Sequence, residues 1–418
     1  MQLGVIADDF TGATDIAGFL VENGVRTIQL NGTPETKLEL DTDAVVISLK
    51  SRSCPARQAV SDSLSALQWL QEQGARQFYF KYCSTFDSTD QGNIGPVTDA
   101  LLDALNEKFT VICPALPING RTVFNGHLFV QGQLLSESGM RNHPVTPMTN
   151  SNLMQLMDAQ SKGETGLVDY QVIEQGCEKI LQKFEELKAQ GKRYAVVDTF
   201  RTQHLDELGK AAGTLKLLTG GSGLAAGLAK HVIRTQPDQT DARKAGYPSR
   251  APCVIFSGSC SEMTNKQVNT YKSQAPHFEL SVEKCINQKN YSDEVCGWVA
   301  DNLDSEYAPM VYATTDSSRL KTRQKQYGPE SSSHAIEQLF SQLAGKLQAI
   351  GVRNFIVAGG ETSGVVVQRL NVDGFHIGPQ IAPGVPWVKT LNGELSLALK
   401  SGNFGDASFF TTAQEYFQ

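Results

Sequence analysis

Residues 3–15 read LGVIADDFTGATD, and this opening stretch decides the fold class. A short apolar run ends in two adjacent carboxylates, Asp8 and Asp9, and the pair Thr11-Gly12 leads into an amphipathic segment. This order predicts a buried strand, a tight turn and the start of a helix. Ligands collect at the carboxyl ends of strands in open α/β sheets, where carboxylates could orient a hydroxyl group or accept its proton. The alternative is that the two carboxylates only cap the helix.

The same alternation of strand-like and helix-like segments continues along the chain. It predicts an α/β protein of two domains, each with a mainly parallel sheet flanked by helices. The strands expected in the first half are residues 2–7, 25–30, 44–48, 77–81, 110–113, 194–198 and 216–219. Those expected in the second half are residues 253–256, 310–313, 354–358 and 396–399. The clearest helices are expected at residues 12–23, 56–73, 96–106 and 333–350.

A polar stretch at residues 234–250 (RTQPDQTDARKAGYPSR) marks the expected domain boundary, because it carries two prolines and shows no periodicity. The chain of 418 residues is long enough for two domains of ordinary size. We therefore expect a first domain at residues 1–233, a linker at residues 234–250 and a second domain at residues 251–418.

Composition argues against several classes of protein. The formal net charge is -7 and no cluster of lysine and arginine occurs, which argues against a nucleic-acid partner. No apolar run reaches the ~18 residues of a membrane span, and no signal peptide is visible. The eight cysteines form no C-x-x-C pair and the seven histidines show no metal-ligand spacing, so we expect reduced thiols and a cytoplasmic location. The oligomeric state stays open, with a homo-oligomer among the outcomes.

Four segments repeat one design, in which an apolar strand runs into a turn of glycine and hydroxyl residues before a helix. They are centred on residues 219–223, 256–261, 358–364 and 400–405. Such turns let the backbone approach a phosphate closely, although α/β proteins also need tight turns for structural reasons. Lys400 could neutralise phosphate charge, or it could be a solvated surface lysine. No P-loop motif is present, and residues 221–227 (GSGLAAG) loosely match a dinucleotide fingerprint whose acidic partner is missing.

A dense polar loop at residues 81–95 (KYCSTFDSTDQGNIG) follows another expected strand. Its candidate ligand-binding side chains are Lys81, Ser84, Asp87 and Thr89. Arg52, just past a neighbouring strand, could reach the same edge, and either it or Lys81 could bind a substrate carboxylate. The alternative is a solvated loop in which Asp87 and Thr89 make only local turn hydrogen bonds.

Together these motifs resemble the four-carbon acid sugar kinase family, most closely its 3-oxo-tetronate kinase branch. The matching segments follow one another along nearly the whole chain: GVIADDFTGATDIAGFLVENG, FKYCSTFDST, GNIGPVTDALL, CPALPINGRT, TGGSGL, SGSCSEMTNKQV, AGGETSG, HIGPQIAPGVPW and ALKSGNFG. The resemblance implies an N-terminal domain that binds the acid sugar through DDFTG, with Thr11, and through FKYCSTFDST. It also implies a C-terminal domain that binds ATP, with the active site in the cleft between the two domains. By matched motif, the residues that contact ATP would be Ser257, Gly359, Gly360, Glu361, Thr362 and Gly402.

The activity implied by the resemblance is ATP-dependent phosphorylation of the terminal C4 hydroxyl of a four-carbon acid sugar, here 3-oxo-tetronate. D-threonate and D-erythronate are alternative substrates within the family. An NAD(P)-dependent sugar-acid dehydrogenase and a non-catalytic sugar-acid sensor are alternatives outside it. For the kinase, Mg²⁺ would bridge phosphate oxygens supported by residues 359–362 and Lys400, although no metal ligand is identified. Asp8 or Asp9 would accept the proton of the hydroxyl, while Arg52 or Lys81 would hold the substrate carboxylate.

Overall fold

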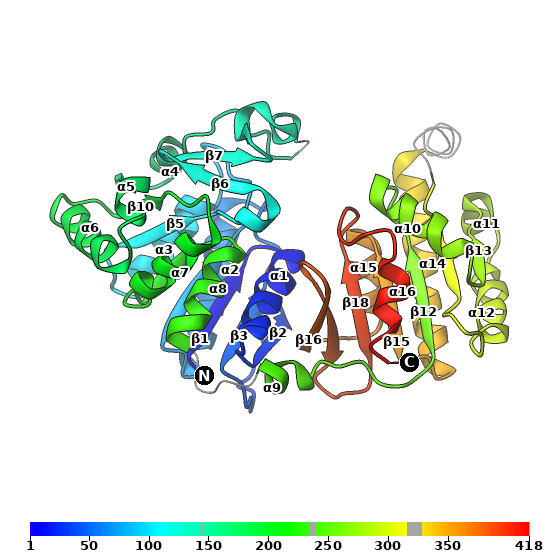
Figure 1. Ribbon diagram of the computed structural model, residues 1–418. Coiled ribbons are helices and arrows are strands. Elements are labelled where there is room, and N and C mark those ends of the chain that lie inside the picture. The colour runs from blue at the N-terminus through cyan, green and yellow to red at the C-terminus, as the bar shows by residue number, and fades with distance from the viewer. Residues whose placement is uncertain (144, 234–238, 316–327, 418) are drawn as a thin grey trace. The chain divides into compact units, whose positions relative to one another are not determined.

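The computed structural model describes residues 1–143, 145–233, 239–315 and 328–417, which form two compact units (Figure 1). The first unit is Met1–Ala242 and the second is Arg243–Gln418. Residues 234–238 of the expected linker lie outside the described residues. The following residues form a short helix, α9 (Gln239–Lys244), that the polar sequence did not indicate.

The first unit has a parallel sheet in the order β2-β3-β1-β4-β11-β5-β10-β9. Its strands are β1 (Leu3–Ala7), β2 (Thr27–Asn31), β3 (Ala44–Ser48), β4 (Gln77–Lys81), β5 (Thr110–Cys113), β9 (Thr165–Val168), β10 (Tyr194–Val197) and β11 (Leu217–Gly220). The central strand β1 is buried at every position, as expected for a parallel strand covered on both faces. The expected mainly parallel sheet is confirmed, and of its strands β9 was not expected from the sequence.

The connections of the first unit leave β1 and β4 in opposite directions. β1 pairs with β4, yet α1 (Phe10–Glu22) leads from β1 to β2 on one side, while α3 (Ile94–Ala104) leads from β4 to β5 on the other. Because such crossovers are right-handed, the two helices lie on opposite faces of the sheet. The carboxyl ends of β1 and β4 therefore flank a topological switch point, where open α/β sheets bind their ligands.

The remaining helices of the first unit are α2 (Ala56–Glu72), α4 (Leu153–Gln160), α5 (Tyr170–Ile173), α6 (Cys177–Ala189), α7 (Thr202–Ala212), α8 (Ser222–Leu228) and the π-helical turn η4 (Ala229–Ile233). They cover the sheet, and α7 and α8 lie side by side with α1 (Figure 1). A Cβ added at Gly209 or at Gly227 would run into the backbone of the facing helix. These glycines thus allow α7 and α8 to pack backbone against backbone.

A small antiparallel sheet follows β5 in the chain. It contains β6 (Arg121–Phe124), β7 (His127–Val130) and β8 (Gln133–Leu134), with the short 3-10 helices η1 (Pro117–Asn119), η2 (Leu135–Glu137) and η3 (Gly139–Asn142) around it. Asn125 and Gly126 both have positive φ, as a two-residue hairpin turn requires. The buried carboxylate of Asp198 accepts hydrogen bonds from both of their N–H groups and so anchors this hairpin to the main sheet.

The second unit has a mixed sheet in the order β13-β14-β12-β15-β18-β17-β16. Its strands are β12 (Cys253–Ser257), β13 (His277–Glu279), β14 (Met310–Tyr312), β15 (Asn354–Ala358), β16 (Gly374–Ala382), β17 (Val385–Thr390) and β18 (Ser396–Lys400). Strands β13, β14, β12, β15 and β18 are parallel to one another, as expected for a mainly parallel sheet. β16 and β17 form an antiparallel hairpin, and β17 pairs with β18. Neither that hairpin nor β13 was expected from the sequence.

A second switch point lies between β12 and β15. The two strands pair, but α10 leads from β12 towards β13 and α15 leads from β15 towards β16 at the other edge. The helices of this unit are α10 (Glu262–Lys272), α11 (Val282–Asn287), α12 (Tyr291–Asp301), α14 (Pro329–Ala349), α15 (Gly360–Arg369) and α16 (Phe409–Gln414). Among the described residues, no helix has the length and apolar character that a membrane span requires.

Candidate functional site

Arg52 organises a charged cluster at the switch point of the first unit. Its Nε and Nη2 atoms donate to the two carboxylate oxygens of Asp8 at 2.9 and 2.8 Å. Nη2 also lies 2.8 Å from Asp9 Oδ1, and Nη1 lies 3.8 Å from Asp87 Oδ2. Arg52 therefore joins the turn after β1 to the polar loop after β4.

The two adjacent carboxylates of the opening motif have different surroundings. Asp8 is buried, and burial raises its pKa above the usual range against the lowering effect of the Arg52 guanidinium. Asp9 caps α1, because its Oδ1 accepts the N–H of Gly12 at 2.8 Å. Its side chain is 30% exposed, against 7% for Asp8. Capping is thus confirmed for Asp9, which still presents part of its carboxylate to solvent.

Lys81 lies beside the first turn of α1. It is the last residue of β4, in register with Ala7 of β1, and its Nζ donates to the Tyr82 carbonyl at 2.8 Å. A Cβ added at Gly12 would come within 3.0 Å of this Nζ. The ammonium group and the N-terminus of a 13-residue helix therefore favour an anion at the same place.

Asp15 and Ser222 extend the cluster, and the sequence analysis did not select them. Asp15, one turn along α1, accepts a hydrogen bond from the Ser222 hydroxyl at the start of α8. Burial raises the pKa of Asp15, opposed by the nearby Lys81 ammonium. Asp15 stands in the opening motif and Ser222 in the GSGLAAG segment, but their pairing over 207 residues leaves no local signal in the sequence.

The polar loop at residues 81–95 is internally ordered. The Thr85 hydroxyl donates to Asp87 Oδ1 at 2.6 Å, and Asn93 donates to the carbonyls of Ser51 and Cys54 at 2.8 Å each. The alternative of a solvated loop is therefore wrong for Asp87, whose side chain is largely buried. The remaining candidates of this unit are all half-buried: Thr11 in the first turn of α1, and Ser84 and Thr89 in the loop.

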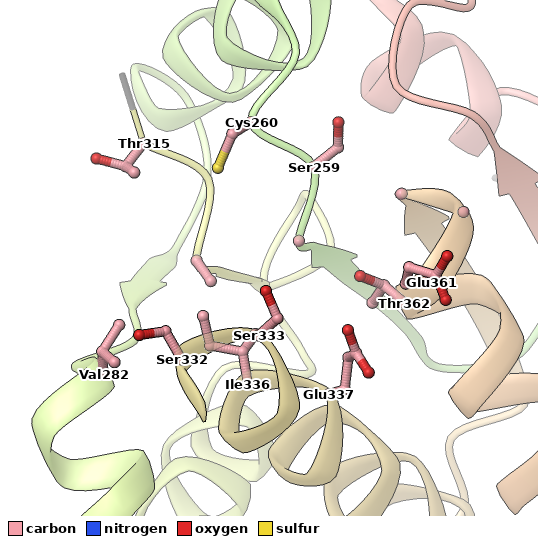
Figure 2. A pocket seen from close by; sticks show the side chains of 14 residues that line it. Ser259, Cys260, Val282, Thr315, Ser332, Ser333, Ile336, Glu337, Glu361 and Thr362 are labelled. Atoms are coloured by element: carbon pink, nitrogen blue, oxygen red, sulfur yellow. The ribbon is translucent and has the colours of Figure 1, made fainter. Parts of the chain in front are cut away.

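A pocket of 230 Å³ lies at the switch point of the second unit. Figure 2 shows that its walls come from the segments after β12, β14 and β15, from α14 and from the start of α11. Val282 and Ile336 line the pocket with apolar side chains, and Glu337 on α14 and Glu361 on α15 add carboxylates to its lining (Figure 2). Burial raises the pKa of Glu337, and the charge of Glu361 raises it further.

The glycine turns of this pocket suit an anion. The N–H groups of Gly258 and Ser259 donate to the Ala358 carbonyl at 2.9 and 3.1 Å, which ties the two turns together. Gly359 has a φ of 132°, a conformation that L side chains rarely adopt, and directly precedes the ten-residue helix α15. Gly359, Gly360, Glu361 and Thr362 all line the pocket at the N-terminus of α15, where exposed N–H groups favour phosphate.

Lys400 ends the neighbouring strand β18, and Gly402 lies in the turn that follows it. The Gly359 N–H donates to the Lys400 carbonyl at 2.9 Å. Lys400 is only 1% exposed, so the alternative of a solvated surface lysine is wrong. Its Nζ donates to Thr264 Oγ1 and to the carbonyls of Ser401 and Gly402 at 2.9–3.1 Å. Lys400 thus holds the 401–402 turn against the N-terminus of α10.

Ser257 lies beneath the pocket. It is the last residue of β12, it is fully buried, and its hydroxyl is 2.6 Å from Thr314 Oγ1. Its carbonyl accepts the N–H of Ala313, a residue that lines the pocket. The Ser257 side chain therefore supports the pocket wall, whereas the next residues, Gly258 and Ser259, line the cavity itself.

The glycines of residues 221–227 have structural roles. Gly221 and Gly223 approach the backbone carbonyls of Pro114 and Ala115, where an added Cβ would lie 2.6 and 2.5 Å from the oxygen. Gly227 makes the close contact between α7 and α8 described above. The resemblance of this segment to a dinucleotide fingerprint is therefore explained by packing, and no observation favours the dehydrogenase.

Two family models cover most of the chain. A model described as a sugar-binding N-terminal domain matches residues 3–228, and one described as a nucleotide-binding C-terminal domain matches residues 254–410. Curated relatives named 3-oxo-tetronate kinase include proteins from Actinobacillus succinogenes, 60% identical, and Haemophilus influenzae, 59% identical. Both alignments cover 100% of this chain and of the relative.

Two solved structures share the fold and much of the sequence. A crystal structure of a Haemophilus influenzae protein is 58% identical with a TM-score of 0.91, and it covers 99% of this chain and 100% of that one. A crystal structure of a Salmonella typhimurium protein is 53% identical with a TM-score of 0.95, and it covers all of both chains.

Proposed function

Because this chain belongs to the family of kinases with a sugar-binding N-terminal and a nucleotide-binding C-terminal domain, we propose that it phosphorylates 3-oxo-tetronate with ATP. The phosphoryl group goes to the terminal C4 hydroxyl. The observation that carries this proposal is that each unit places its candidate residues at its own topological switch point, one lined with charged side chains and one with glycine turns. The sequence identity of this chain, over its whole length, with curated 3-oxo-tetronate kinases supports the same substrate.

In the acid-sugar domain, residues 1–233, we assign separate tasks to the charged residues. Lys81, beside the N-terminus of α1, holds the substrate carboxylate, since three carboxylates already surround the guanidinium of Arg52. Arg52 instead fixes the turn and loop that carry the other contacts, which we assign to Thr11, Ser84, Asp87 and Thr89. Asp9 orients the C4 hydroxyl and accepts its proton, because it is more exposed than Asp8 and only one of its oxygens is taken by the helix cap.

In the ATP-binding domain, residues 251–418, the turns at 258–260 and 359–362 hold the nucleotide phosphates, with Gly402 beside them and Ser257 behind them. Glu337 and Glu361 both line the pocket and their charges repel each other, which suits a bound divalent cation. Among the described residues no group of three or more metal-ligating side chains is present, but Mg²⁺ needs only one or two carboxylates besides phosphate and water. The residues present therefore fit Mg²⁺, which when bound would neutralise charge on the transferred phosphoryl group.

An ADP-release assay with MgATP and a panel of four-carbon acids tests the function. The panel contains both 3-oxo-tetronate enantiomers, D-threonate and D-erythronate. We expect strong turnover with one 3-oxo-tetronate, because hydrogen-bonding sites reject analogues that leave buried polar groups unpaired. Turnover with D-threonate or D-erythronate instead would support the kinase activity and contradict the proposed substrate.

Thermal protection separates the kinase from a dehydrogenase or a sensor. MgATP at 100 times its Kd should stabilise the protein by about 2.7 kcal/mol, whereas NAD(P) should have no effect. Protection by NAD(P) alone would contradict the proposal, and binding of ATP and acid without turnover would point to a sensor. A cytoplasmic location and assembly into a homo-oligomer stay predictions.

Gly402→Ala tests the nucleotide turns. The added Cβ would lie 2.6 Å from Ser259 Oγ and 2.9 Å from Ser261 Oγ, so both hydroxyls must move. We expect the KM for ATP to rise about tenfold, a loss of about 1.4 kcal/mol of binding, with the KM for the acid unchanged. Gly364→Ala on α15 is the matched control, because an added Cβ there has no neighbour within 4 Å. A rise in the KM for the acid alone would contradict this assignment and would place the turn in the acid-binding site.

A further inference from the structure

Lys400 carries a buried amino group whose hydrogen bonds in the described part of the chain include none to a carboxylate. Its three hydrogen-bond acceptors, the Thr264 hydroxyl and the carbonyls of Ser401 and Gly402, are all neutral. The ring of Phe409 lies 5.8 Å from Nζ on another side. Among the residues that the structure describes, no carboxylate lies within ion-pair distance of Nζ. A lone buried charge is costly, and proteins ordinarily pair it or neutralise it.

The elements packed around Lys400 supply no titrating partner. On α10, Glu262 pairs with Lys266 at 3.3 Å, and Lys272 stacks over Tyr312, so these charges are engaged elsewhere. In the turn before α16, Asp406 accepts hydrogen bonds from Ser408. On β15 the register partner of Lys400 is Ala358. Three titratable groups line the adjacent pocket: Cys260, Glu337 and Glu361.

The missing counter-charge has one natural source. Ala358, beside Lys400 on the neighbouring strand, is followed at once by the glycine turn 359–362, which we propose holds phosphates. Neighbouring strands are only about 4.8 Å apart, so a phosphate on that turn lies within the range where charges interact strongly in a weakly polar interior. Nζ also holds the Gly402 carbonyl, so its charge state affects the 401–402 turn.

We propose that Lys400 is a positioning residue that takes up a proton when the nucleotide binds. The step is an acid–base equilibrium, in which the free amine binds one proton from solvent and no bond forms to the nucleotide. The ammonium form then keeps all three hydrogen bonds to the 401–402 turn and to Thr264, while the phosphates balance its charge. This inference rests on the proposed nucleotide site.

The physical basis is the effect of burial on Lys400. Burial alone lowers its pKa to about 8, so near pH 8 a large part of the free protein carries the neutral amine. An anion nearby favours the ammonium form and raises the pKa towards the usual lysine value. Proton uptake is therefore absent well below pH 8, where the lysine is already charged, and grows as the pH rises through 8.

Isothermal titration calorimetry with MgADP measures this uptake directly. At each pH the binding heat is recorded in buffers of different ionisation enthalpy, and the slope gives the number of protons bound. Phosphate groups ionise near pH 6, so MgADP itself contributes little from pH 7 upwards. We expect close to zero protons per site at pH 7.0 and about half a proton or more at pH 8.5.

Three variants identify the group that takes up the proton. Lys400→Met has no amine and Lys400→Arg stays charged at every pH used, so both should bind MgADP without proton uptake at pH 8.5. Lys266→Met removes an exposed lysine of α10 that does not line the pocket and should keep the uptake. Each variant is first checked for a cooperative thermal transition. If neither Lys400 variant folds, the pH dependence of proton uptake by the full-length wild-type protein decides, and we expect its midpoint near pH 8.

The outcomes separate this inference from the function. MgADP binding without proton uptake at pH 8.5 overturns the inference and leaves the nucleotide site intact. Uptake that persists in a folded Lys400 variant, disappears in Lys266→Met, or begins only above pH 9 also overturns it. Absence of any MgADP binding overturns the proposed function, and the inference with it.

Discussion

Arg52→Met is expected to lower the free energy of unfolding by about 3 kcal/mol, the lower end of the range for breaking a buried ion pair. The lower end applies because the Arg52 side chain is 24% exposed. Without the guanidinium, the carboxylates of Asp8, Asp9 and Asp87 lose the cation that contacts all three, and for Asp8 the weaker effect of the Lys81 ammonium remains. Urea unfolding at pH 7.0 measures the loss.

The loss should depend on pH in a defined direction. Arg52 lowers the pKa of Asp8 against the effect of burial, so its removal raises the folded-state pKa of Asp8 further above the unfolded value. A carboxyl group with a raised folded-state pKa destabilises the fold when it is ionised and ceases to do so as the pH falls through that pKa. The difference from wild type should therefore be smaller at pH 5.0 than at pH 7.0.

Arg57→Met is the matched control for this variant. Arg57 is an exposed residue at the start of α2, five positions along the chain, so its removal should change stability by no more than about 0.5 kcal/mol. Equal effects of the two substitutions at pH 7.0 would show that Arg52 does not hold the turn and the loop together.

Asp9→Asn is expected to lower kcat by about 10²–10⁴, the usual contribution of a general base, with little change in either KM. Asparagine is as good a helix cap as aspartate, so its carbonyl oxygen can still accept the Gly12 N–H and α1 should stay folded. The substitution thus removes the proton acceptor and spares the structure. The ADP-release assay gives kcat, and thermal unfolding shows whether the fold is kept.

Two further substitutions make this result specific. Asp8→Asn should act mainly on stability, because it weakens the bidentate pair with Arg52. Asp90→Asn, an exposed residue of the same polar loop, should be neutral in both measurements. If Asp9→Asn turns over at the wild-type rate with the wild-type pH dependence, Asp9 is not the base and Asp8 takes its place.

The sequence predicted the sheets well because parallel strands carry a strong local signal. Residues 3–7 are an unbroken apolar run between turn signals, and β1 occupies the same residues. The β16–β17 hairpin was missed, since its prolines, Pro379 and Pro386, argue against strands. The structure accommodates them with register shifts next to Gln380, where the pairing is irregular.

The candidate site was predicted in part, because placement after a strand is local but side-chain pairing is not. The turns after β1, β4 and β15 were recognised from their residues alone. That Arg52 would be surrounded by carboxylates depends on Asp8, 44 residues earlier in the chain. The glycines at 221–227 were ambiguous for a different reason, since close approach of a backbone looks the same in sequence whether the neighbour is a phosphate or a helix.

The presence of a separate switch point in each unit has a consequence for how such proteins diversify. The residues that would select the acid stand on the turns after β1 and β4, and those that would hold the nucleotide stand on the turns after β12 and β15. Apart from Lys81 and Ser257, which end β4 and β12, these residues lie outside the buried strands that stabilise the sheets. Substitutions on the turns of the first unit can therefore change which acid is recognised, while the phosphate donor and both sheets stay the same.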